Sequence, residues 1–195
     1  MSSPHVDNKL QIVAFSTNDT TQTPNEIINI FLGQQNHTVI KKSRHAICFS
    51  TTLKNSTKMT TIMIRSILNL TREYTGINDV NCYILFIDLE KDDSMEKLDL
   101  IINYASDYCE LMKKIYVLGM ISGKEENIRC INKADIIKKL DQVKLNYEYK
   151  EINLLKSKEI ADIILQILDY SYKFSINAEL DDNRNDRQAK SCQIF

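Results

Sequence analysis

The segment that most restricts the fold is residues 80–89, VNCYILFIDL, in which nearly every residue is apolar. A strand with one face in water alternates apolar and polar residues, whereas a strand buried on both faces is apolar almost throughout. We therefore predict that this segment is the middle strand of a sheet covered by helices on both faces. Such sheets are mostly parallel and are built from alternating strands and helices.

The rest of the chain shows that alternation. Apolar and β-branched runs predict six strands, at residues 9–15, 45–53, 58–65, 80–89, 114–121 and 144–152. Apolar residues spaced three and four apart, together with capping signals, predict four helices, at residues 24–33, 93–109, 132–143 and around 160–168. The expected fold class is α/β, with a mostly parallel six-stranded sheet and helices on both of its faces.

The length of 195 residues and an apolar content of 43% suit one domain with a closed core. We expect a leader over residues 1–8 and a folded domain over residues 9–174. From residue 175 the apolar period stops and the sequence becomes polar and charged. Residues 175–195 are therefore predicted to be a flexible tail.

Charge and cysteine content exclude several classes of protein. The net charge is −1 and the calculated isoelectric point is near 6.3, which argues against a nucleic-acid partner. The five cysteines include no CxxC pair, which argues against a zinc site and suits a reducing compartment. The N-terminal residues do not form a signal peptide, and the apolar runs are too short to span a bilayer. We expect a cytoplasmic protein.

The last four residues, CQIF, match a signal for prenylation. Cys192 stands four residues from the end, an aliphatic residue precedes the last position, and the terminal Phe195 favours a geranylgeranyl group over a farnesyl group. Processing would remove residues 193–195 and leave a thioether at Cys192. The sequence thus predicts a protein held on the cytosolic face of a membrane by a lipid at its C terminus.

The order of predicted elements, the polar tail and this C-terminal signal resemble the small GTPases of the Ras superfamily, Rab-like and Ras-like members in particular. The resemblance covers residues 7–195. Its best local matches are VDNKLQIVAF and ILFIDLEKDDSMEKL; the second is similar to the family's strand that ends in Asp before a Ser-aromatic helix start, with Met95 in the aromatic place. The resemblance implies a three-layer P-loop fold.

The phosphate loop of that family does not survive in this chain. The family's GxxxxGK[ST] motif wraps phosphates with backbone N–H groups and a lysine, but the corresponding residues are STNDTTQT. Ser16 and Thr21 occupy the glycine places, Gln22 occupies the lysine place, and Thr23 alone keeps the magnesium-binding hydroxyl. Side chains at glycine positions crowd the phosphates, and Asp19 adds negative charge. We predict a degenerate phosphate loop.

The other nucleotide motifs are missing at their expected places. The DxxG motif would fall near residues 64–67, the guanine-recognising NKxD at residues 120–123 and the SAK-like loop at residues 153–155. The letters NKAD occur at residues 132–135, but they follow a poor strand and leave too short a spacer before the next motif. A helix start with Asn132 as the N-cap explains them better.

These features predict a prenylated, membrane-tethered pseudo-GTPase that acts as a protein-binding module or scaffold in membrane trafficking or signalling, without catalytic residues, a metal or a cofactor. A single lipid chain gives marginal membrane residence, so its expected partners are a membrane and proteins, including a prenyl-binding chaperone. One alternative is a divergent active GTPase of vesicle traffic, which binds GTP or GDP with magnesium through Thr23 and residues 132–135. Another is a structural subunit whose C-terminal match is accidental.

Overall fold

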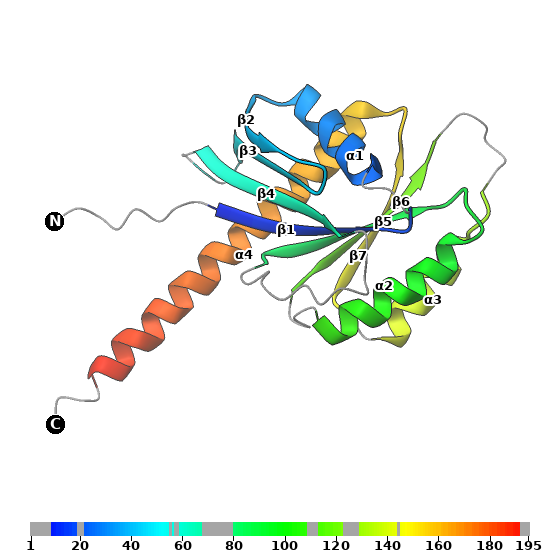
Figure 1. Ribbon diagram of the computed structural model, residues 1–195. Coiled ribbons are helices and arrows are strands. Elements are labelled where there is room, and N and C mark those ends of the chain that lie inside the picture. The colour runs from blue at the N-terminus through cyan, green and yellow to red at the C-terminus, as the bar shows by residue number, and fades with distance from the viewer. Residues whose placement is uncertain are drawn as a thin grey trace.

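The computed structural model describes residues 9–18, 22–54, 56, 59–67, 80–108, 113–122, 129–143 and 145–191. Its elements in chain order are β1 (Lys9–Ser16), α1 (Gln22–Gln34), β2 (His37–Lys42), β3 (Ala46–Thr52), β4 (Met59–Ile67), β5 (Cys82–Asp88), α2 (Ser94–Tyr108), β6 (Ile115–Ile121), α3 (Lys133–Gln142), β7 (Tyr147–Asn153) and α4 (Ser157–Ser191). Figure 1 shows the sheet with helices around it. The predicted α/β class is confirmed.

The strands form one sheet in the order β2-β3-β4-β1-β5-β6-β7. β1 runs parallel to both of its neighbours, β4 and β5, and β5, β6 and β7 continue the parallel part. Only β3 breaks the parallel order, since it pairs antiparallel with β2 and with β4. Six of the seven residues of β5 are buried, which agrees with the prediction that residues 80–89 lie inside the sheet.

The sheet has seven strands in place of the six that were predicted, because β2 was missed. Its sequence, HTVIKK, contains β-branched residues, but all six side chains are exposed or half-exposed. A strand at the edge of a sheet that buries nothing has no hydrophobic alternation, and alternation is the signal on which strand prediction depends. The hairpin predicted from residues 45–53 and 58–65 is present as β3 and β4.

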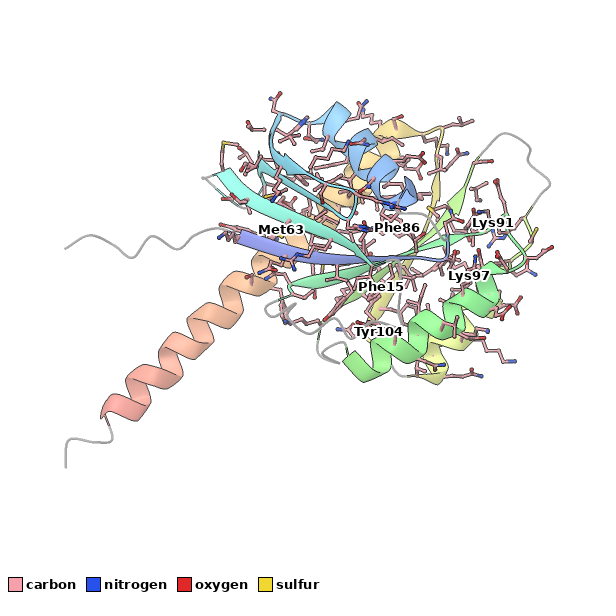
Figure 2. The ribbon with its side chains drawn as sticks, in the orientation of Figure 1. Phe15, Met63, Phe86, Lys91, Lys97 and Tyr104 are labelled. Atoms are coloured by element: carbon pink, nitrogen blue, oxygen red, sulfur yellow. The ribbon has the colours of Figure 1, made fainter. Side chains whose placement is uncertain are left out.

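Two separate apolar clusters cover the two faces of the sheet. Residues of α1 and α4 pack on one face, against alternate residues of the strands such as Ile12 and Phe86. Residues of α2 and α3 pack on the other face, where the ring of Phe15 lies 6.2 Å from that of Tyr83 and 5.8 Å from that of Tyr104. Figure 2 shows Phe15 and Tyr104 between the sheet and α2. The alternation along β1 thus directs neighbouring side chains to opposite cores.

The last helix, α4, is 35 residues long and projects beyond the sheet (Figure 1). Its first half carries the predicted apolar stripe, with Ile160, Ile164 and Leu168 buried. The flexible tail predicted from residue 175 is instead helical to Ser191. The segment contains neither Gly nor Pro, so no residue in it interrupts the hydrogen-bond ladder.

The predicted leader at residues 1–8 and the predicted prenylation signal at residues 192–195, which includes Cys192, lie outside the described residues. Within the described part of the chain, no helix combines the length and the apolar character needed to cross a membrane.

Candidate functional site

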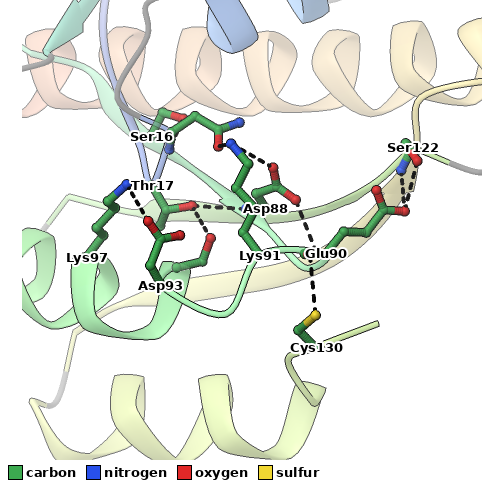
Figure 3. Close-up of polar contacts among 11 residues, drawn as sticks. Ser16, Thr17, Asp88, Glu90, Lys91, Asp93, Lys97, Ser122 and Cys130 are labelled. Carbon is green, nitrogen blue, oxygen red and sulfur yellow. Dashed lines mark hydrogen bonds and ion pairs between the residues drawn. The ribbon is translucent and has the colours of Figure 1, made fainter. Parts of the chain in front are cut away.

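The candidate site lies where β1, β5 and β6 end. These parallel strands run in the same direction, so their carboxyl ends meet at one edge of the sheet, the usual position of a ligand in an open α/β fold. Residues after the three strands supply its polar groups: Thr17 and Asn18 after β1, Glu90 and Lys91 after β5, and Ser122 after β6. Figure 3 shows two sets of contacts, one around Thr17 and Lys91 and the other between Glu90 and Ser122.

Thr17 is the centre of this arrangement and is completely buried. Its backbone N–H donates to the carbonyl of Phe86 at 3.0 Å. Its hydroxyl donates to the hydroxyl of Ser94 at 3.0 Å and accepts from the N–H of Asp88 at 3.0 Å (Figure 3). The side chain of Thr17 therefore joins the end of β1 to the end of β5 and to the first residue of α2. Sequence analysis missed Thr17, whose only signal was its place directly after a predicted strand.

Lys91 also contacts the ends of β1 and β5, from the solvent side. Its ammonium group donates to the side-chain oxygen of Asn18 at 2.7 Å and lies 3.7 Å from a carboxylate oxygen of Asp88 (Figure 3). Lys91 is exposed, so these contacts are in exchange with water and each is weak. The cation nearest the loop after β1 is thus bound to groups of the protein itself.

The predicted degenerate phosphate loop is described only at its two ends. Ser16 ends β1, and its hydroxyl accepts from the N–H of Asn18 at 3.1 Å, which turns the chain locally. Thr21 lies outside the described residues. Gln22 and Thr23 begin the backbone of α1, and their side chains are not described.

The electrostatics at this edge are acidic. Asp88, Glu90, Asp92 and Asp93 lie within six residues, beside Lys91. A hydrogen bond from Lys97, at 2.8 Å, lowers the pKa of Asp93, so this exposed carboxyl stays charged (Figure 3). In the described ranges, no three His, Cys, Asp or Glu side chains are grouped to hold a metal ion. The four carboxylates add negative charge at this edge, which Lys91 and Lys97 offset in part.

Hydrogen bonds also join the end of β6, the expected place of the NKxD motif, to the segment after β5. Glu90 accepts hydrogen bonds from the N–H and the hydroxyl of Ser122 at 2.9 and 3.0 Å. The thiol of Cys130 donates to the carbonyl of Glu90 at 3.3 Å (Figure 3). A hydrogen bond with Asp92 raises the pKa of this exposed thiol, which keeps it neutral and a poor nucleophile. Residue 123, the last of the expected NKxD place, lies outside the described residues.

The NKAD letters lie at the start of α3, as the helix-start interpretation predicted. Asn132 occupies the N-cap position with extended backbone angles, but its side chain makes no capping hydrogen bond, so the predicted cap contact is wrong. Its backbone carbonyl instead accepts from the N–H of Asp135 at 3.2 Å. Asp135 lies exposed in the first turn, where its charge favours the helix dipole.

A further polar cluster joins the segment before α3 to β7. Arg129 forms two hydrogen bonds with Glu151, at 2.8 and 3.0 Å, and the hydroxyl of Tyr149 donates to the same carboxylate at 3.0 Å. Arg129 is the main cause of the lowered pKa of Glu151, and Glu151 raises that of Arg129. Gly119 on β6 makes room for this cluster, because a Cβ there would lie 2.6 Å from the Tyr149 hydroxyl. No sequence motif marks these residues.

The two remaining expected motif positions lie in a strand and in a turn. Residues 64–67, the place of the DxxG motif, form the end of β4, with Ile64, Ser66 and Ile67 buried. After β7, the side chain of Asn153 accepts from the N–H of Leu155 at 2.9 Å and forms a turn into α4. Residues 64–67 are thus part of the sheet, whereas residues 153–155 form a turn in which Leu155 is exposed.

A scan against models of known protein families found no match, and a search of the curated proteins found none either.

Proposed function

We propose that this chain is a prenylated, membrane-tethered pseudo-GTPase with a three-layer P-loop fold, which acts as a protein-binding module or scaffold in membrane trafficking or signalling. The observation that carries the proposal is the position of Thr17. Its buried hydroxyl bonds Asp88 and Ser94, at the place where a small GTPase would hold phosphates. The order of the elements supports the fold that the resemblance implies, with β2 as an added strand at one edge.

The binding free energy lost with the missing motifs favours a site that holds no nucleotide. A hydrogen bond that involves a charged group contributes about 1.5–3 kcal/mol, so loss of the phosphate-binding lysine and of a carboxylate pair to guanine removes about 3–6 kcal/mol. That loss is about two to four powers of ten in affinity. Phosphoryl transfer depends almost entirely on positioned positive charge, and the carboxylates of Asp88 and Glu90 supply the opposite sign.

Titration calorimetry of the full-length chain with GDP and with GTP, each with magnesium, tests this proposal. We expect no binding at micromolar concentrations, because the chain lacks the phosphate-binding lysine and the guanine-binding motif at their expected places. Circular dichroism of the same sample provides the control that the protein is folded. Binding at micromolar concentration or tighter would contradict the proposal and indicate a divergent active GTPase.

The membrane tether is tested separately at Cys192. In the native cells, Cys192→Ser should move the protein from the membrane fraction to the soluble fraction, because the thioether anchor can no longer form. Cys130→Ser, which changes an exposed cysteine outside the signal, is the matched control and should leave localisation unchanged. Mass spectrometry of the native C terminus should show a geranylgeranyl group and the loss of residues 193–195. An unmodified C terminus would support the structural-subunit alternative.

One lipid chain gives only reversible membrane binding, so the tethered module needs a second attachment. Residues 181–191 contain as many acidic as basic residues and therefore offer little attraction to anionic lipid. A protein partner would therefore supply the second attachment that keeps the chain on the membrane. A prenyl-binding chaperone would carry the chain between membranes. Crosslinking and co-purification, with and without Cys192, would identify such partners.

A further inference from the structure

Among the described residues, no strand pairs with the outer edge of β2. β2 pairs with β3 on one side and ends the strand order on the other (Figure 1). Every second residue of an edge strand directs its backbone N–H and C=O groups away from the sheet, where they can pair with another strand. The edge thus offers backbone hydrogen bonds without any rearrangement of the fold.

The side chains on this edge include two large apolar residues. Val39 is 46% exposed and Ile40 is 57% exposed. The pairing with β3 shifts by one residue between Val39 and Lys41, so Ile40 has no partner opposite it. Ile40 is therefore an exposed apolar side chain at the bulge, available to a partner.

β2 and the turn that follows it carry only positive charge. Residues 27–72 contain seven lysines and arginines and no aspartate or glutamate, although the whole chain has a net charge of −1. Lys41, Lys42 and Arg44 follow one another at the end of β2 and are exposed. Within the described part of the chain they form no ion pair; the ammonium group of Lys42 donates to the neutral side chain of Asn29 at 3.1 Å.

We propose that the outer edge of β2 binds an extended, acidic segment of a partner protein, which adds to the sheet as an eighth strand. Backbone groups would give the affinity, apolar side chains of the segment would cover Val39 and Ile40, and its carboxylates would face Lys41, Lys42 and Arg44. A second copy of this chain fits the edge poorly, because its own β2 has no carboxylate to face Lys41, Lys42 and Arg44. The inference names the binding surface of the module proposed above and rests on that proposal.

Fluorescence anisotropy with the full-length chain tests this surface. The probe is a labelled octapeptide in which Glu alternates with Val, and the comparison peptide has Lys in place of Glu. We expect the acidic peptide to bind and the basic peptide not to bind. The variant Lys41→Glu/Lys42→Glu should bind the acidic peptide about tenfold more weakly or worse, and it should bind the basic peptide more tightly than the wild type does. Lys138→Glu/Lys158→Glu, on exposed helical positions, is the matched control and should change affinity less than about twofold.

Hydrogen exchange of the unmodified protein adds a readout that is independent of any variant. Amides within residues 37–42 should gain protection when the acidic peptide is bound, because new backbone hydrogen bonds form there. Several results would overturn the inference: no peptide binding, binding unchanged by Lys41→Glu/Lys42→Glu, equal binding of a Glu-Gly peptide, or β2-dependent binding of phosphatidylserine vesicles or of a second copy in place of the peptide. Nucleotide calorimetry remains the test of the module itself, so failure of one proposal is distinguishable from failure of the other.

Discussion

The carboxylate of Asp169 on α4 accepts a hydrogen bond from the backbone N–H of Lys54 at 2.9 Å, so the last helix holds the turn that follows β3. Asp169 is only 8% exposed, whereas most acidic residues of the chain lie at the surface. The contact spans 115 positions of sequence and joins α4 to the hairpin half of the sheet.

Asp169→Ala should therefore lower the free energy of unfolding by about 1–3 kcal/mol, because a buried acceptor is lost and the turn N–H is left without it. Urea denaturation followed by circular dichroism measures the change. Asp162→Ala, at an exposed position of the same helix, is the control and should cost less than about 0.5 kcal/mol. Equal losses for the two variants would show that the contact with Lys54 is unimportant.

Thr17→Val should also destabilise the fold, by about 1–3 kcal/mol. Valine has nearly the shape of threonine, but it leaves the N–H of Asp88 and the hydroxyl of Ser94 without their partner in a buried place. Thr17→Ser keeps the hydroxyl and should lose less stability. If the valine variant is as stable as the wild type in thermal unfolding, Thr17 does not join β1 to β5 as described.

Gly119→Ala tests the close approach of Tyr149 to β6. The added Cβ would lie 2.6 Å from the Tyr149 hydroxyl, so one of the two must move, at a cost of about 1–3 kcal/mol. Tyr149→Phe removes that hydroxyl, and the double variant should therefore lose less than the sum of the single losses. A double-mutant cycle from denaturation curves measures this coupling. Strict additivity would contradict the close contact.

The pair between Arg129 and Glu151 predicts a pH dependence. The pKa of Glu151 is lowered in the folded state, so the pair stabilises the fold above the ordinary glutamate pKa of about 4.3. That contribution should disappear as the pH falls through the lower folded-state pKa. Glu151→Gln should make the acid side of the stability curve shallower, and Arg129→Gln should reproduce the effect. A curve unchanged from that of the wild type in both variants would argue against the pair.

Most of the fold was accessible from sequence because its parallel core follows simple patterns. The run at residues 80–89 identified the buried strand, and apolar spacing identified the helices that pack on it. β2 was not predicted, because an edge strand without a buried face has no such pattern. The extension of α4 escaped because residues beyond Ser175 lack an apolar stripe, although their lack of Gly and Pro was visible.

The site was predictable mainly by what the motifs lacked. The sequence located the loop after the first strand and showed Ser16 in a glycine place, but it gave no sign that Thr17 would bond across to Ser94, 77 residues away. The pairing of Arg129 with Glu151 and the space at Gly119 depend on how neighbouring strands pair. Such contacts join residues that are distant in sequence, and spacing along the chain carries no information about them.

The 35 residues of α4 correspond to a rod about 50 Å long, whose buried half is fixed in the core. Its free end points to the side on which β1 begins, whereas Lys91 and the strand exits lie on the opposite side (Figures 1 and 2). A stiff stalk of this kind gives the molecule a defined polarity. If the C-terminal end of α4 is attached to a membrane or a protein, the ends of β1 and β5 lie on the side of the molecule away from that attachment.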